Sequence, residues 1–236
     1  MITVLGPDSY RDWNFFILFN LKKITYILFF FFLGNAFSQK TIKREFNAFE
    51  ITTIEINSDI IYHINITSEK TNQIKINTQI EGENYENVVL SILEENEILK
   101  INTPYTPFFK VKNDKLAAHK LISIEMELIV PETIKIQIVA AISSLTTLGE
   151  FKELSADLEG GNCILNNFKG NALLKTKQGF ITVYANKEIF GTAISKKGIV
   201  INELSNPKAK RKKNNTSKHL VEAESFSGNI SLFQIH

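Results

Sequence analysis

A repeat marked by glycine in the second half of the chain limits the available folds more than any other feature. Equivalent positions are Ser143, Gly161, Gly179, Gly198 and Gly228, which are 18, 18, 19 and 30 residues apart. The residues five and seven before each marker, and two and four after it, are apolar or small with few exceptions. Each unit therefore predicts two short strands joined at a glycine turn, because glycine readily takes the positive φ of a tight corner.

A single unit of this kind has only two strands and cannot bury its own apolar side chains. Stacked units can, because each strand then pairs with the equivalent strand of the next unit about 4.8 Å away. The sequence thus predicts an all-β protein in which residues 136–236 form a parallel β-solenoid (β-helix). Small residues five before the marker, such as Ala156, Ala193 and Ala223, predict a thin coil with these side chains pointing inward.

Residues 39–135 predict a β region that precedes the repeats. Apolar and polar residues alternate there, a pattern typical of half-buried strands. The expected strands are residues 51–56, 59–67, 72–80, 87–93, 97–103 and 121–130. Polar, turn-forming stretches between them predict hairpins. The pattern leaves open whether this region is continuous with the solenoid.

Residues 21–38 are typical of a signal peptide. Lys22 and Lys23 precede a ten-residue apolar run, residues 24–33, which is too short to span a bilayer. Residues 36–38, Ala-Phe-Ser, fit a cleavage site. We therefore expect export with removal of this segment, and an uncleaved membrane anchor is the alternative.

The segment before the signal peptide needs a separate explanation. A signal peptide starts at the initiator, yet residues 1–20 precede it. We interpret residues 1–20 as a wrongly assigned start that is not translated, with Leu21 at the initiator position. The mature chain would then begin at Gln39 and contain one cysteine, Cys163, so that no intramolecular disulfide could form.

Several stretches of the mature chain resemble a known family. They are the alternating first half, DKLAAHKLISIEMELIVPE at 114–132, GEFKELSADLEGGNCILNNFKGNALLKTKQGFITV at 149–183 and the glycine-marked units. Over residues 40–236 the chain is similar to exported bacterial β-strand-repeat proteins named auto-transporter adhesins with a head GIN domain, whose function is uncharacterised. The resemblance implies a parallel β-solenoid in the periplasm, at the surface of a Gram-negative cell, or secreted. It implies no catalytic residues for this chain.

The sequence offers no pattern of a catalytic, cofactor or metal site. Asp157 and Glu159 each precede a lysine, Lys175 and Lys177, by 18 residues, so the repeat places each acid above a lysine. Such an arrangement is either a site or a set of cross-strand charge pairs on a solvated face, and we expect the second. The four histidines lack the spacing of a zinc site. Cys163 stands in an apolar column, where we expect it to be buried and unreactive.

Residues 206–219 form an insertion between the fourth and fifth units. Its cations are Lys208, Lys210, Arg211, Lys212, Lys213 and Lys218. No acid accompanies them, and the rest of the mature chain is net acidic. This asymmetry favours an anionic partner, namely lipopolysaccharide, an acidic glycan or a phospholipid surface, and not nucleic acid. A solvated insertion kept polar for solubility is the alternative.

Together these observations favour a non-enzymatic exported protein of the envelope or surface, an adhesin-like binding or structural module that needs no cofactor. The alternative is a glycan-active enzyme, a lyase or glycosidase, on the same scaffold. Such enzymes need clustered acids, which the sequence does not suggest. The main aromatic candidates for sugar stacking are Tyr184 and Phe233. A signalling accessory of the envelope is a third possibility, and the oligomeric state is left open.

Overall fold

The structure is a computed structural model that describes residues 39–82, 85–109, 122–187, 189–204 and 219–235. The chain divides at Ser38, and all described residues belong to the unit Gln39–His236. The expected signal peptide and the residues before it lie outside the described residues. Within the described ranges no helix is both long and apolar enough to cross a membrane.

Nearly all of this unit is β-structure, as the alternating and repeating patterns predict. The strands are β1 (Gln39–Asn47), β2 (Thr53–Ser58), β3 (Ile61–Glu69), β4 (Gln73–Glu81), β5 (Ser91–Glu95), β6 (Ile98–Asn102), β7 (Ser123–Pro131), β8 (Lys135–Ile142), β9 (Ser144–Gly160), β10 (Cys163–Gln178), β11 (Ile181–Ala185), β12 (Ile189–Ser195), β13 (Val200–Asn202), β14 (His219–Ser225) and β15 (Ile230–Gln234). Two short 3-10 turns, η1 (Ala48–Glu50) and η2 (Tyr85–Asn87), are the only helical segments in the described part of the chain. The strands form one mixed, 15-stranded sheet, so the all-β prediction is confirmed.

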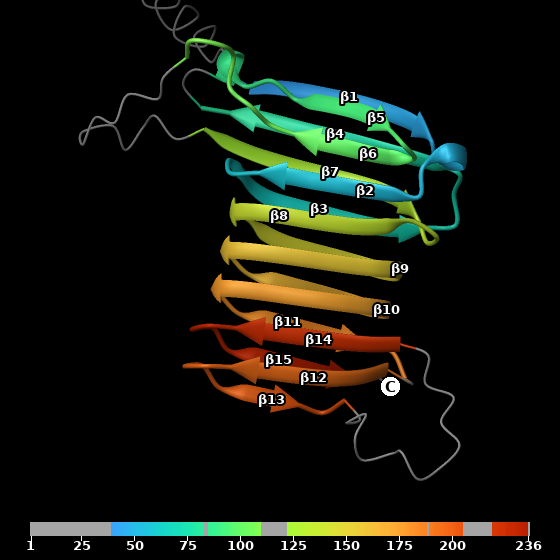
Figure 1. The fold of residues 1–236 in the computed structure, drawn as a ribbon, viewed down its shortest axis with the longest axis vertical. Helices are drawn as coiled ribbons and strands as arrows, with labels where there is room; N and C mark the ends of the chain where they lie inside the picture. The colour runs from blue at the N-terminus through green and yellow to red at the C-terminus, as the bar shows by residue number, and fades with distance from the viewer. Residues whose placement is uncertain (1–38, 83–84, 110–121, 188, 205–218, 236) are drawn as a thin grey trace, which may run out of the picture. The chain divides into compact units, whose positions relative to one another are not determined.

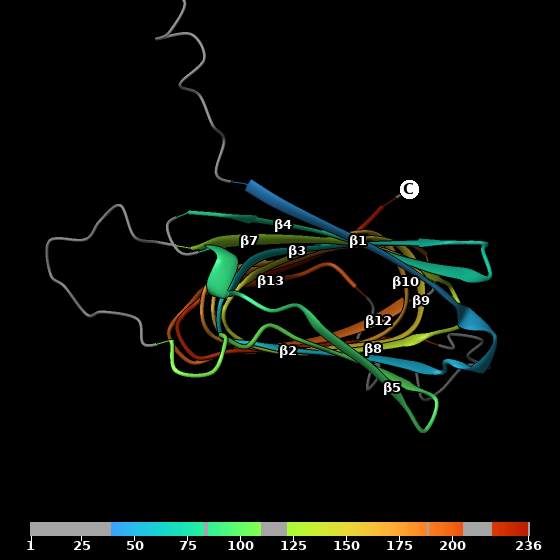
Figure 2. The ribbon, with the colours of Figure 1, turned by 90° about the horizontal axis from the view of Figure 1, so that it is seen from above.

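The sheet folds into two layers that face each other across the hydrophobic core (Figure 2). The first layer, called the β8 layer here, contains β2, β8, β14, β12 and the second halves of β9 and β10. The second, called the β11 layer, contains β3, β11, β15, β13 and the first halves of β9 and β10. β9 and β10 belong to both layers because they bend, and Phe151 and Phe168 stack at the two bends with ring centroids 6.0 Å apart. Both rings are buried, so they fill one end of the core.

The apolar columns of the repeat form the interior, as predicted. In the β11 layer, Leu145, Cys163, Ile181 and Ile230 lie in register on successive strands and are all fully buried. In the β8 layer the equivalent column contains Ala156, Leu174 and Ala223. These two alanines are 2% and 4% exposed, so their predicted inward orientation is confirmed. Ala193, at the end of the column, is partly buried against the core.

Glycines at the corners allow the units to approach closely. Gly161 and Gly179 have φ values of 109° and 113°, a conformation that L side chains rarely adopt. A Cβ atom on Gly179 would lie 2.0 Å from the carbonyl oxygen of Gly161, and one on Gly228 would lie 1.6 Å from that of Gly179. Ser143 starts this series, and its hydroxyl donates a hydrogen bond to the carbonyl oxygen of Ile61 on β3. The corner therefore needs glycine wherever one unit stacks on the next.

The order of the last two units differs from the prediction. We expected the fifth unit to stack on the fourth, but β14 lies between β10 and β12, and β15 lies between β11 and β13 (Figure 1). The fifth unit thus occupies an interior position and the fourth unit forms the end of the stack. The fourth and fifth units, which residues 206–219 separate in the chain, are still neighbours in space, but their order in the stack is reversed.

Burial of apolar surface gives a physical reason for the exchange. The fifth unit points Val221, Ala223, Ile230 and Leu232 inward, and each is at most 4% exposed. The fourth unit has Gly191, Ala193, Val200 and Asn202 at the same positions. The unit with larger apolar side chains buries more apolar surface when it has a neighbour on both sides. The unit with smaller and more polar side chains therefore lies at the end of the stack. Val200, expected inside, is accordingly 40% exposed.

The hairpin prediction for the first half is largely wrong. Among the described strands, only β5 and β6 are consecutive strands paired antiparallel. The turn between β2 and β3 moves the chain from one layer to the other, because β2 pairs with β8 whereas β3 pairs with β7 and β9. Residues 87–93, expected as a strand, contribute a strand only from Ser91. The parallel pairs β2–β8 and β3–β9 carry the sheet across residue 135 into the repeats.

Candidate functional site

The cations expected to contact an anionic partner cannot be placed in the fold. Lys208, Lys210, Arg211, Lys212, Lys213 and Lys218 lie outside the described residues. The described residues present two outer surfaces, one on each layer.

The outer surface of the β8 layer is charged. One row across its strands reads Val139, Asp157, Lys175, Glu224 and Ile194, each in register with the next. Lys175 thus lies between two acids on the neighbouring strands. The predicted stacking of Asp157 on Lys175 is confirmed. Glu224, from the fifth unit, is the second acid beside Lys175, and the expected order of units would have placed it two strands away.

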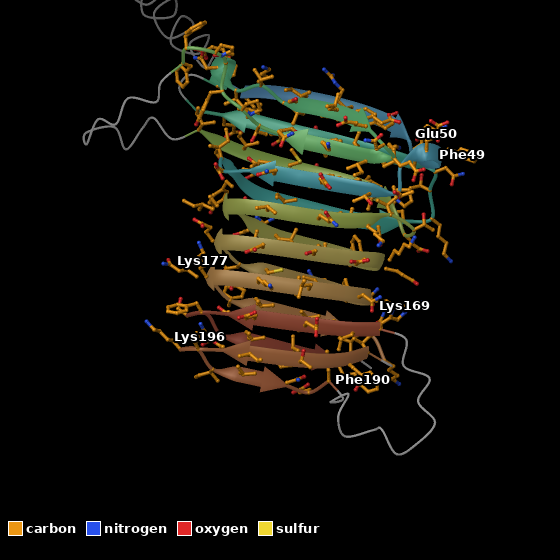
Figure 3. The ribbon with its side chains drawn as sticks, viewed as in Figure 1. Phe49, Glu50, Lys169, Lys177, Phe190 and Lys196 are labelled. Carbon is orange, nitrogen blue, oxygen red and sulfur yellow. The ribbon has the colours of Figure 1, made fainter. Side chains whose placement is uncertain are left out.

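The second predicted pair, Glu159 and Lys177, forms an ion pair at one edge of this layer. The hydrogen bond from Lys177 to Glu159 raises the pKa of the lysine. Both side chains are more than half exposed, so solvent screens the pair and its contribution to stability is small. Figure 3 shows Lys177 and Lys196 at the same edge of the stack and Lys169 at the opposite edge. The charges of the β8 layer are typical of a solvated face.

A shallow depression of about 230 Å³ lies at this same edge, lined by Lys175 and its two flanking acids and by Phe226. The ammonium nitrogens of Lys196 and Lys197 lie 5.5 and 4.8 Å from the centroid of the Phe226 ring, within range of a cation–π interaction. The flanking acids have Lys175 between them, so their charge is partly compensated. Asp157 and Glu224 are exposed in this open depression, so both acids are solvated groups beside a lysine.

The outer surface of the β11 layer is uncharged over four consecutive strands. Residues 144–148, 163–166, 181–185 and 230–234 contain no Asp, Glu, Lys or Arg. Their outward side chains alternate with the buried columns and form the neutral face, defined as Thr146, Leu148, Ile164, Asn166, Thr182, Tyr184, Ser231 and Phe233. Glu203 follows β13 and bounds this face at the end of the stack. Toward the other end of the sheet, Asn77 on β4 donates a hydrogen bond to Glu127 on β7.

Two aromatic rings of the neutral face lie side by side. Tyr184 on β11 is in register with Phe233 on β15, and their ring centroids are 5.5 Å apart with an angle of 22° between the planes. Tyr184 is 38% exposed. Two residues earlier on the same strands, Thr182 is in register with Ser231. The rings and the hydroxyls therefore form parallel rows that run from strand to strand.

The described residues include neither an exposed cysteine nor a group of side chains that could bind a metal. Cys163 is fully buried, and burial raises the pKa of its thiol to about 12. The Nε2 atom of His63 lies 2.9 Å from Oδ1 of Asn65 and 3.4 Å from Oγ1 of Thr146. No group of three or more His, Cys, Asp or Glu side chains that could hold a metal occurs in the part of the chain that the structure describes. His119 and His236 lie outside that part.

Comparison with known proteins gives a match in structure and none in sequence. No family model matches the chain, and no curated protein matches it significantly. A solved structure from Clostridium sporogenes, provisionally named a cell adhesion protein, superposes with a TM-score of 0.60. It is 18% identical and aligns over 84% of this chain and 100% of its own. The two proteins share a fold.

Other solved structures resemble the chain less closely. Proteins provisionally named adhesins from Bacteroides fragilis and Parabacteroides distasonis are 14% and 12% identical, with TM-scores of 0.35 and 0.40. The alignments cover 82% and 83% of this chain and 97% and 93% of theirs.

The sequence identified both aromatic residues of the neutral face, but not that they meet. Tyr184 and Phe233 each stand five residues after a marker, Gly179 and Gly228. In the expected order of units Glu203, five after Gly198, would have separated them. An equal distance from the marker predicts that two residues lie in the same row of the sheet. It does not predict which residues are neighbours in that row.

Proposed function

We propose that this chain is a non-enzymatic, adhesin-like module exported to the bacterial envelope or surface, whose residues 136–236 form a parallel β-solenoid. The parallel pairing of residues 18 apart, such as Leu145 with Cys163 and Cys163 with Ile181, supports the solenoid. The signal-peptide pattern of residues 21–38 supports export. The name of the Clostridium sporogenes structure, which shares the fold, agrees with an adhesive role.

The observation that carries this proposal is the contrast between the two outer surfaces. An enzyme on this scaffold would need acids held in an enclosed cleft, yet Asp157 and Glu224 are exposed beside Lys175 in an open, shallow depression. The β11 layer instead presents rows of neutral polar and aromatic side chains on a paired, well-packed sheet. Such a flat, rigid surface is suited to contact with an extended partner, because few side chains need to be ordered on binding.

An anionic partner at the six cations between Lys208 and Lys218 is a second element of this proposal. The attraction would be mainly electrostatic and should weaken with salt. Binding of residues 39–236 to lipopolysaccharide and to anionic vesicles, measured at low salt and at about 1 M sodium chloride, tests it, since the Debye length falls there to about 3 Å. We expect binding at low salt only, and we expect replacement of residues 210–213 by serine to remove most of it.

The function as a whole is tested by a binding screen coupled to an activity screen. Residues 39–236 would be incubated with neutral and acidic polysaccharides, lipopolysaccharide and anionic vesicles, and each polysaccharide would also be examined for new reducing ends or unsaturated products. We expect binding to at least one of these surfaces without any cleavage. Cleavage would establish the glycan-active enzyme instead, and absence of binding to all of them would contradict the adhesin-like role.

A further inference from the structure

The neutral face has a composition that the fold itself does not require. Its eight side chains point away from the core. Charged residues are usually frequent at such outward positions. The β8 layer follows that expectation, because Asp157, Lys175 and Glu224 stand at equivalent outward positions on the other surface of the same units. A charged partner would find no compensating group among the eight residues. The chemistry of this face therefore favours a ligand without charge.

The polar groups of the neutral face are available to such a ligand. The side chains of Asn166, Thr182 and Ser231 make no hydrogen bond to any other described residue. Hydroxyl and amide groups both donate and accept hydrogen bonds, as the hydroxyls of a sugar also do. Thr182 and Ser231 lie on adjacent strands, so their hydroxyls are presented as a pair.

The aromatic pair supplies the apolar part of the same surface. The rings of Tyr184 and Phe233 stack with centroids 5.5 Å apart and planes within 22° of parallel, so they form one offset-stacked aromatic platform. A pyranose ring has a face of C–H groups and an edge of hydroxyls, so it can cover such a platform while its edge reaches polar neighbours. Tyrosine suits this role because its ring is apolar and its hydroxyl is a hydrogen-bonding group.

The two rows run perpendicular to the strands and in parallel with each other. One row contains Thr146, Ile164, Thr182 and Ser231, and the other contains Leu148, Asn166, Tyr184 and Phe233. Successive strands lie about 4.8 Å apart, so the rows extend over about 14 Å from β9 to β15. This length exceeds one sugar ring and suits a chain of sugars lying along the stack.

We propose that the neutral face binds a neutral glycan chain, with Tyr184 and Phe233 stacking on a sugar ring and Asn166, Thr182 and Ser231 bonding its hydroxyls. This inference rests on the adhesin-like role proposed above and assigns its ligand class. It is separate from the anionic partner of the six cations, since none of those cations belongs to the neutral face.

The test is affinity electrophoresis of residues 39–236 in gels that contain dextran, laminarin, mannan or a neutral galactan, with alginate as the acidic reference. We expect at least one neutral polysaccharide to retard the protein, and the retardation to persist at about 1 M sodium chloride because no charge is involved. Tyr184→Ala and Phe233→Ala should each weaken that binding about tenfold or more, as the loss of an aromatic contact at the centre of an interface does. Both side chains lie at the surface, so the melting temperature should change little.

Phe226→Ala is the matched control, because it removes a 46% exposed aromatic ring from the turn after β14, at the edge of the opposite layer. It should leave retardation unchanged. The inference is overturned if Phe226→Ala weakens binding as much as Tyr184→Ala, or if neither ring of the neutral face affects it. Binding only to alginate, lipopolysaccharide or anionic vesicles, abolished by serine at residues 210–213, would overturn this inference and keep the adhesin-like role. Absence of binding to every glycan and vesicle would overturn both.

Discussion

Tyr184 and Phe233 stack on one another with ring centroids 5.5 Å apart because the fifth unit of the repeat lies against the third and not against the fourth. Had the units stacked in the order of the sequence, Glu203 would stand between the two rings. The exchange of the last two units therefore removes an acid from the middle of the row and creates the aromatic platform. The same exchange that buries the more apolar unit thus also determines the composition of the neutral face.

The order of the units can be tested by engineered disulfides. Thr182 is in register with Ser231, so Thr182→Cys with Ser231→Cys places two cysteines on adjacent strands, within the Cα separation that a disulfide spans. Ile201 is in register with Ser231 on its other side, so Thr182→Cys with Ile201→Cys places them two strands apart, about 9.6 Å. We expect rapid oxidation of the first pair only, measured by mass spectrometry. Cross-linking of the second pair and not the first would show that the units stack in the order of the sequence.

Overpacking should cost more in the interior of the stack than at its end. Ala223 is 4% exposed between strands on both sides, whereas Ala193 lies on the last strand of the same layer. Ala223→Phe should lower the free energy of unfolding by about 1–3 kcal/mol or more, and Ala193→Phe by less, since its side chain can shift toward solvent. Denaturant unfolding of the two variants gives the comparison. An equal loss for both would mean that the last unit is enclosed as tightly as the fifth.

The corner glycines should not tolerate a side chain. Gly179→Ala would place a Cβ 2.0 Å from the carbonyl oxygen of Gly161 at a φ of 113°, so we expect a loss of about 1–3 kcal/mol in the free energy of unfolding. Gly160→Ala is the matched control, because its Cβ would meet its nearest neighbour at 3.7 Å. That variant should unfold close to the parent. A Gly179→Ala variant as stable as Gly160→Ala would contradict the close stacking of the corners.

Cys163 should react with a thiol reagent only when the protein unfolds. Burial raises the pKa of the thiol from 9.0 to about 12, so the folded protein contains almost no thiolate at pH 8. The rate of labelling at pH 8, with and without denaturant, measures this directly. A fast reaction of the native protein would show that the column of Leu145, Cys163 and Ile181 is accessible.

The same pKa shift implies a dependence of stability on pH. The unfolded chain loses the thiol proton near pH 9, whereas the folded chain retains it to about pH 12. The unfolded state thus binds fewer protons in this interval, and stability should fall as pH rises from about 9 to about 12. Cys163→Ala removes the titration and should flatten that part of the profile, although it also leaves space in the core. A decline that is unchanged in Cys163→Ala would assign the effect to other groups.

The sequence by itself determined what is local to one unit. The alternation of apolar residues sets which side chains point inward, so the buried columns through Ala156 and Cys163 were predicted correctly. The corner glycines and the pairing of Glu159 with Lys177 followed from the spacing of 18 residues. These features depend on the period of the chain, which any single unit displays.

The tertiary structure alone decided which units are neighbours. All units share one period, so the pattern permits any order, and the choice depends on how much apolar surface each unit buries in each position. Val221 and Leu232 favour the interior over Gly191 and Asn202, a comparison between segments far apart in the chain. Hairpins were likewise predicted from local turns, although β2 and β3 separate into opposite layers to cover the same core. Because the platform of Tyr184 and Phe233 exists only in the resulting order, the candidate site was a property of long-range packing and not of any local motif.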